Sequence, residues 1–167
     1  MKVILIDNQG KIKLDLGLIE KISTYISNKF DRDQNCELNI IFTGKEKIRL
    51  LNKKYRNVDM ETDVLSFSYT GAEDRDLFGS CENADESKDS SDVFTIGEII
   101  ICPEVADDNV SRQKENWNLN LEIILLIIHG ILHIYNYDHE KRKDKIDMEN
   151  VQESILNDVR SIYLFNG

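Results

Sequence analysis

Residues 119–134 read LNLEIILLIIHGILHI, and on a helix this stretch is apolar almost all the way round. A helix that is apolar on every side has to lie in the centre of a domain, because any side left in water forfeits the free energy of burial. The longest purely apolar run, 123–128, falls far short of the roughly 20 residues that span a bilayer. We therefore predict a soluble globular domain built around a central buried helix, with no membrane partner.

Strand and helix patterns surround this predicted central helix. In 45–56 the spacing predicts an amphipathic helix with Ile48, Leu51 and Tyr55 on its buried stripe. Strands are expected at 3–6, 36–43, 64–68 and 94–102, and further helices at 16–30, after Pro103 and through Met148, Val151, Ile155, Val159 and Ile162. Strands alternate with helices early and helices dominate late, which is typical of an α+β domain with a small sheet.

The chain has 167 residues, which fits a single domain over 1–167, and its net charge is −10. The acid is concentrated in 71–92, which holds eight acidic residues against two basic ones. This segment lacks apolar periodicity, so we expect an acidic surface loop, either a tolerated insertion or a lid or partner-binding segment. The negative charge weakens the case for nucleic-acid binding, but its uneven distribution does not exclude it.

The three cysteines, Cys36, Cys81 and Cys102, lie far apart in the sequence. No pair has the short spacing of a zinc knuckle or a redox motif, so we expect reduced thiols in a cytoplasmic protein. The apolar run at the amino terminus meets a charge at Asp7 and is too short for a signal peptide.

All three histidines fall in one run, HGILHIYNYDH. His129 and His133 are four residues apart, so on a helix both imidazoles project from one face and can hold a single metal ion. Polar turn residues at 136–138 should end the helix, and the chain can then return His139 as a third ligand. Three imidazoles with a fourth position open to water are typical of a catalytic zinc site. We predict one zinc ion per chain, the alternative being histidines that find their partners in the core without metal.

The residue after the first histidine separates this run from the zinc peptidases. Enzymes with the H-E-x-x-H motif carry their general base there, whereas this chain has Gly130, so peptide hydrolysis is disfavoured. Asp138 could orient a metal ligand or simply belong to the turn. A bound zinc would polarise a phosphoryl or carbonyl oxygen and lower the pKa of its water to about 7.

Three segments resemble one family in the same order along the chain. HGILHIYNYDH resembles the H-G-x-L-H-x-x-G-Y-D-H signature of the YbeY family of rRNA-maturation endoribonucleases. Residues 51–69, LNKKYRNVDMETDVLSFSY, are similar to that family's L-N-x-x-Y-R-x-x-D-x-P-T-(D/N)-V-L-S-F-P segment, and 96–106, IGEIIICPEVA, to its L-G-(D/E)-I-x-I-C segment. The histidine signature is highly specific, whereas the amino-terminal part contributes only a compatible order of elements.

The resemblance implies a single-strand-specific, metal-dependent endoribonuclease that acts in 16S rRNA 3′-end maturation and in ribosome quality control. Its partners would be single-stranded RNA, rRNA, the small ribosomal subunit and assembly proteins. It implies zinc ligation by His129, His133 and His139 and a functional arginine at Arg56. It also implies an α+β fold in which a small mixed sheet is flanked by helices and a central buried helix carries the metal-binding histidines.

Three of the chain's departures from the family pattern within these segments replace a glycine or a proline. Asn136 replaces a glycine, and because asparagine tolerates a left-handed backbone we expect the turn to be kept. Glu61 and Ser68 replace two prolines, which should loosen the loop and the strand end near Arg56.

The helix expected at 45–56 contains six basic residues and one acid, Glu46. Lys45, Arg49 and Lys53 share one face and could follow the phosphates of an RNA strand, or they could form an ordinary solvated helix face. Arg56 closes this helix, and its planar fork suits a two-point grip on phosphate. Three further basic residues, Lys141, Arg142 and Lys143, follow the histidine run.

Two functional alternatives stay open at this point. A zinc hydrolase acting on another substrate is one, and a non-catalytic ribosome-assembly factor with a structural metal is the other. Glu61, Asp63 and Asp138 lie in the motifs, but the sequence identifies none of them as the general base. The oligomeric state, the nucleophile (water or a ribose 2′-hydroxyl) and the choice of zinc over nickel or copper are likewise not fixed by the residues.

Overall fold

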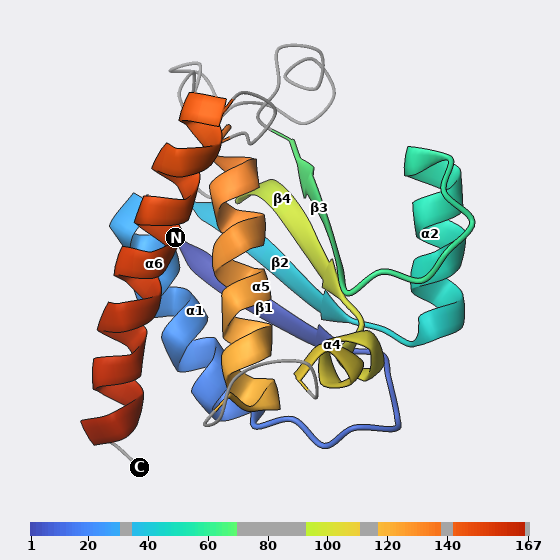
Figure 1. Cartoon of the computed structure of the whole chain (residues 1–167), viewed down its shortest axis with the longest axis horizontal. Coiled ribbons are helices and arrows are strands. Elements are labelled where there is room, and N and C mark those ends of the chain that lie inside the picture. Colours follow the sequence, from blue (N-terminus) through green and yellow to red (C-terminus); the bar gives the residue numbers. More distant parts are fainter. Residues whose placement is uncertain (31–34, 70–92, 111–116, 138–141, 166–167) are drawn as a thin grey trace.

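A computed structural model describes residues 1–30, 35–69, 93–110, 117–137 and 142–165 (Figure 1). The acidic segment 71–92 lies outside the described residues, as do Asp138 and His139. The elements are β1 (Lys2–Asp7), α1 (Leu16–Phe30), β2 (Cys36–Phe42), α2 (Lys45–Arg56), β3 (Val64–Ser68), β4 (Phe94–Ile101), α4 (Pro103–Val110), α5 (Leu119–Ile134) and α6 (Arg142–Phe165). These bounds agree with the predicted elements to within one or two residues, except that α6 begins earlier than its apolar pattern indicated.

The four described strands form one mixed sheet in the order β1-β2-β4-β3. β1, β2 and β4 run parallel, and β3 runs antiparallel to β4 at the edge of the sheet. The predicted α+β fold with a small mixed sheet flanked by helices is therefore confirmed.

Alternate residues of β4 separate the two faces of this sheet. Ile99 and Ile101 belong to the main core together with residues of α1, α5 and α6. Ile100 packs with Leu65 of β3 and Ile48 of α2 in a smaller cluster. Because successive side chains of a strand point to opposite faces, α5 and α2 cover opposite faces of the sheet. In Figure 1, α5 crosses in front of the strands, and α2 stands beyond the β3 edge.

Helix α5 is the central helix that the sequence predicts. It begins at the N-cap residue Asn118, whose side chain accepts a hydrogen bond from the amide of Leu121 at 3.0 Å. Most of its residues are buried, and Ile123, Ile127 and Ile131 are fully buried. Within the part of the chain that the structure describes, no helix is both long and apolar enough to cross a membrane.

Two side chains differ from what the sequence predicts. Tyr55 was expected on the buried stripe of α2, but it is 54% exposed, whereas Ile48 is fully buried. The last turn of α2 lies against the edge strand β3, where the Tyr55 ring meets Phe67 edge-on with 4.9 Å between centroids.

The sequence predicts reduced thiols throughout, and Cys102 is indeed free and buried. Cys36, however, is disulfide-bonded, so that prediction is wrong for Cys36.

Candidate metal and RNA site

His129 and His133 bring their imidazoles together on the last two turns of α5. The two Nε2 atoms lie 3.0 Å apart, the ring centroids are 4.6 Å apart, and the ring planes are nearly perpendicular at 83°. Two nitrogens each about 2.0–2.1 Å from a tetrahedral zinc are roughly 3.3 Å apart. A shift of a few tenths of an ångström would therefore let both rings bind one ion, and the pair fits a metal site.

The other ring nitrogen of His129 contacts helix α6. Its Nδ1 lies 3.1 Å from Oε1 of Gln152. An amide oxygen only accepts hydrogen bonds, so this contact favours the tautomer with the proton on Nδ1 and the lone pair on Nε2. Sequence reasoning missed Gln152. A usable signal exists, because Gln152 is a polar residue one turn after Met148 on the apolar side of the predicted helix.

The end of α5 has the hydrogen-bond pattern of a Schellman turn. The amide of Asn136 donates to the carbonyl of His133 at 3.0 Å, and that of Tyr137 donates to Leu132 at 2.9 Å. Asn136 has a left-handed backbone with φ 61°, so the predicted turn survives the replacement of glycine by asparagine. The helix ends where the sequence indicated, directly before the segment that carries His139.

The third predicted ligand lies outside the described residues. Among residues that the structure does describe, no group of three histidine, cysteine or acidic side chains is close enough to hold a metal ion. The ligation of zinc by His139 therefore stays a prediction, as does any role of Asp138. Next to His129 a pocket of about 230 Å³ opens, lined also by Lys145, Met148, Glu149 and Gln152.

Gly130, which stands where a zinc peptidase has its base, is a packing residue. A Cβ at this position would lie only 2.8 Å from Cδ1 of Ile99. Helix α5 therefore approaches strand β4 so closely at the histidine turn that a glutamate could not fit there unless the Ile99 side chain or the helix moved.

The basic side chains predicted to share one face of α2 form ion pairs with acidic side chains. Arg49 Nε and Lys53 Nζ contact the two carboxylate oxygens of Asp59 at 2.7 and 2.8 Å. Hydrogen bonds from Lys53 and Arg49 lower the pKa of Asp59 to about 2. The structure therefore supports the alternative of a solvated, ion-paired helix face for these residues.

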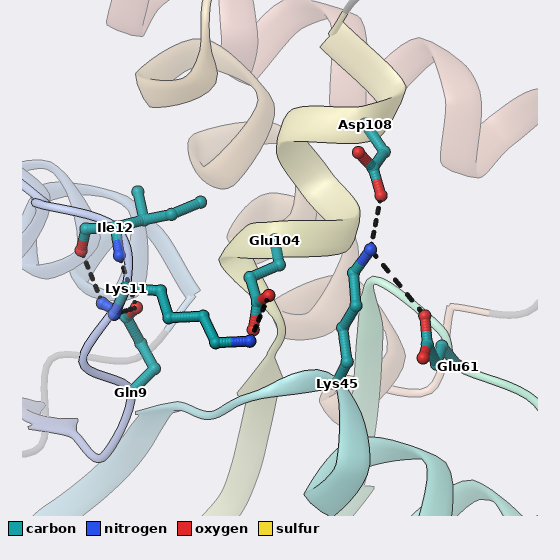
Figure 2. A network of polar contacts seen from close by, with 7 residues as sticks. All are labelled: Gln9, Lys11, Ile12, Lys45, Glu61, Glu104 and Asp108. Carbon is teal, nitrogen blue, oxygen red and sulfur yellow. Dashed lines mark hydrogen bonds and ion pairs between the residues drawn. The ribbon is translucent and has the colours of Figure 1, made fainter.

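A second set of ion pairs joins the loops at the carboxyl ends of the parallel strands (Figure 2). Lys11, after β1, contacts Glu104 in the first turn of α4 at 2.9 Å. Lys45, at the start of α2, lies 2.7 Å from Asp108 of α4 and 3.9 Å from Glu61. The carboxylate of Glu61, which replaces a family proline, is thus engaged with Lys45. Figure 2 shows Lys45 between the two acids, where it links α2 to α4.

Asp63, another carboxylate of the motif, is held by its own neighbourhood. Its Oδ1 accepts from the amide of Val64 at 2.8 Å, and its Oδ2 accepts from Nδ2 of Asn109 at 3.1 Å. These bonds fix the start of β3 and give Asp63 a structural role.

Arg56 is exposed at the end of α2, and no ion pair involving it is present within the described ranges. The left-handed Asn57, with φ 58°, ends the helix directly after it. Arg56 ends α2, whereas His129 and His133 lie on α5, and these two helices cover opposite faces of the sheet.

Strand β3 nevertheless connects the end of α2 with the histidine turn of α5. Phe67 meets Tyr55, the neighbour of Arg56, on the α2 side. The next residue, Ser68, donates a hydrogen bond from Oγ to the carbonyl of Ile134, the neighbour of His133, at 3.2 Å. The α2 terminus and the histidine turn therefore flank the same end of β3 on its two faces. Ser68, the second replacement of a family proline, forms part of this connection.

Taken together, fold and site define a class of protein: a small α+β domain whose central helix presents paired imidazoles suited to a metal ion. The family model described as Endoribonuclease YbeY matches residues 5–160. Endoribonuclease YbeY of Clostridium beijerinckii is 30% identical over 168 residues, which cover 96% of this chain and 99% of the relative. That of Thermoanaerobacter sp. is 35% identical over 156 residues, covering 92% and 94%. The chain belongs to the YbeY endoribonuclease family.

A solved structure shares the fold. The solution structure of TM1509 from Thermotoga maritima has a TM-score of 0.60 at 24% identity, covering 98% of this chain and 93% of that one. At this level of identity the likeness concerns the fold alone. The resemblance seen in the three sequence segments is thus confirmed at the level of family and of fold.

Proposed function

We propose that this chain is a zinc-dependent endoribonuclease that cuts single-stranded RNA and acts in 16S rRNA 3′-end maturation and ribosome quality control. Its membership of the YbeY family supports an RNA substrate. The proposed metal centre is supported by the 3.0 Å separation of the Nε2 atoms of His129 and His133. His139 is the third ligand in this proposal, and one zinc ion is bound per chain.

The chemistry of the donors favours zinc. Imidazole nitrogens suit zinc, copper, nickel and iron, whereas magnesium and calcium prefer oxygen ligands. A zinc ion held by three imidazoles would act as a Lewis acid on a phosphoryl oxygen and activate water. The roles of His129 and His133 are to hold that ion on a helix that the core fixes on all sides, so little reorganisation is needed.

Arg56 is the residue proposed to grip the RNA phosphate. Its exposed guanidinium can donate two hydrogen bonds to a phosphate without first giving up an acidic partner in the described structure. An RNA strand that passes over the end of β3, across Phe67 and Ser68, would meet Arg56 on one side and the histidine turn on the other.

Two other functions are alternatives, and each predicts a different experimental result. A zinc peptidase is disfavoured, because Gly130 stands where such an enzyme has its base and a side chain there would meet Ile99. A non-catalytic assembly factor is favoured by one observation: Asp59 neutralises Arg49 and Lys53, which reduces the free positive charge of α2. In either role we propose that the protein works in the cytoplasm with the small ribosomal subunit and assembly proteins, without a membrane.

The experiment is cleavage of matched single-stranded and double-stranded RNA by zinc-loaded wild type, Arg56→Ala and Arg49→Ala. We expect cutting of the single strand only, a loss of about 10²–10³-fold for Arg56→Ala, and near wild-type rates for Arg49→Ala, whose side chain is already bound to Asp59. Zinc-loaded wild type that binds ribosomal partners but leaves RNA intact would favour the assembly-factor reading instead.

A further inference from the structure

We infer that Gln152 is a positioning residue for the metal centre: it holds the proton of His129 on Nδ1 and so keeps the Nε2 lone pair directed at the metal position. This inference rests on the proposed zinc site. It adds a residue that the histidine signature does not contain and that belongs to another helix.

The contact itself fixes the direction of the hydrogen bond. Nδ1 of His129 lies 3.1 Å from Oε1 of Gln152, and only the ring nitrogen can be the donor to an amide oxygen. In the tautomer that makes this contact, His129 carries its proton on Nδ1 and its lone pair on Nε2. Nε2 of His133 lies 3.0 Å from Nε2 of His129, where it can donate a hydrogen bond to that lone pair. An ion bound between the rings would use the lone pairs of both Nε2 atoms, and His133 would then carry its proton on Nδ1.

The backbone that carries Gln152 is held by the core. Met148 one turn earlier is 3% exposed, and Ile155 and Leu156 one turn later are 5% and 8% exposed. All three belong to the main hydrophobic cluster that also contains α5. The amide oxygen of Gln152 is thus presented to His129 from a fixed element, as expected of a group that orients a metal ligand rather than of a mobile surface side chain.

Either a neutral amide or a carboxylate at position 152 can accept the hydrogen bond from Nδ1 of His129. A carboxylate at the same position would also accept the Nδ1–H bond, and its negative charge would make the imidazole a stronger ligand. Gln152→Glu should therefore keep the tautomer and bind zinc at least as tightly as wild type. Gln152→Leu, which has a similar size but no acceptor, should lose the preference of the ring for one tautomer.

The test compares wild type, Gln152→Leu and Gln152→Glu with Asn150→Leu, the same amide-to-leucine change at an exposed position of α6. Zinc affinity is measured by competition with a chromophoric chelator, and the His129 tautomer by ¹⁵N chemical shifts of the metal-free protein. We expect an affinity loss of about 10–100-fold in Gln152→Leu, none in Asn150→Leu, and rescue in Gln152→Glu. The thermal midpoint of each metal-free variant shows whether the fold is kept.

Wild-type zinc affinity and an unchanged Nδ1–H tautomer in a folded Gln152→Leu protein would overturn the inference. Failure of the wild type to bind zinc would instead contradict the proposed function. In that case the ¹⁵N shifts of metal-free His129 still decide whether Gln152 sets the tautomer.

Discussion

The backbone of Gly130 faces Ile99 of β4 so closely that a Cβ on residue 130 would lie 2.8 Å from Cδ1 and 2.9 Å from Cγ2 of the isoleucine. Real side chains essentially never approach so closely, so the Ile99 side chain or one of the two elements would have to move. This contact sets the distance between the histidine turn and the sheet. It also gives a physical reason for glycine directly after the first histidine.

Gly130→Ala should therefore destabilise the fold by about 1–3 kcal/mol, because the added methyl overpacks a close helix–sheet contact. Denaturant unfolding measures the change, with Gly10→Ala as the control, since nothing lies within 4 Å of a Cβ at Gly10. The double variant Gly130→Ala with Ile99→Ala should be less destabilised than the sum of the single changes. Additive effects would show that the two residues do not compete for the same space.

The left-handed turn at Asn136 is a second test of the site's support. Asn136→Ala should cost about 1–2 kcal/mol, because alanine is strained at a positive φ, whereas Asn136→Gly should be neutral or stabilising. Asn57→Ala provides a matched control, since Asn57 has φ 58° at the end of α2. Both alanine variants should lose stability, but only Asn136→Ala should also lose zinc affinity, because the turn leads to His139. Equal zinc affinities of Asn136→Ala and Asn57→Ala would show that this turn does not contribute to zinc binding.

Burial of Glu122 predicts a pH-dependent stability. This side chain is 4% exposed, and burial raises its pKa above the ordinary 4.5, with a smaller contribution from the Asp63 charge, while the hydrogen bond from Trp117 opposes the rise. A raised pKa means that the folded state binds the proton more tightly than the unfolded state, so stability falls as pH rises above 4.5. Glu122→Gln keeps an acceptor for the Trp117 Nε1–H, which donates to Glu122 Oε2 at 2.6 Å.

We expect Glu122→Gln to raise the thermal midpoint at pH 7, with the advantage disappearing below about pH 4. Calorimetric scans between pH 3.5 and 8 check this, about 2–4 °C corresponding to each kcal/mol in a chain of this size. The exposed Glu153→Gln serves as the control. A difference that is the same at every pH would contradict the assignment to ionisation.

The acid that neutralises the α2 face gives a prediction about RNA affinity. Asp59→Asn should free Arg49 and Lys53 from their carboxylate partner. Single-stranded RNA should then bind more tightly, and the salt dependence of log K should steepen by up to about 1.4 for two added phosphate contacts. Fluorescence anisotropy at several salt concentrations measures both. Asp107→Asn, an equal charge change on α4, should leave the slope unchanged; equal slopes in the two variants would exclude α2 from the RNA path.

The sequence predicted the parts of the fold that depend on local periodicity. The all-apolar pattern of 119–134 placed α5 in the centre, and the Asn136 turn followed from a backbone preference of one residue. Neighbouring strands in the sheet could not be predicted in the same way, because β4 lies between β2 and β3, out of sequence order, and such pairing depends on contacts distant in sequence.

Side-chain partners from distant segments explain the remaining differences. The periodicity of α2 placed Tyr55 inside, but its neighbour is Phe67 at a sheet edge, so the ring stays half exposed. Acids that neutralise the basic face come from the following loop and from α4, which a helical pattern does not reveal. Gln152 was missed for the same reason, since its partner His129 is on another helix.

Metal content and RNA cleavage measured on the same preparations of wild type and His133→Ala test the proposed metal centre most directly. Wild type should carry one zinc per chain and cut single-stranded RNA, and His133→Ala should lose zinc and activity together while keeping its fold. A wild-type protein that binds no zinc, or a zinc-free His133→Ala protein that cuts RNA at the normal rate, would contradict the account.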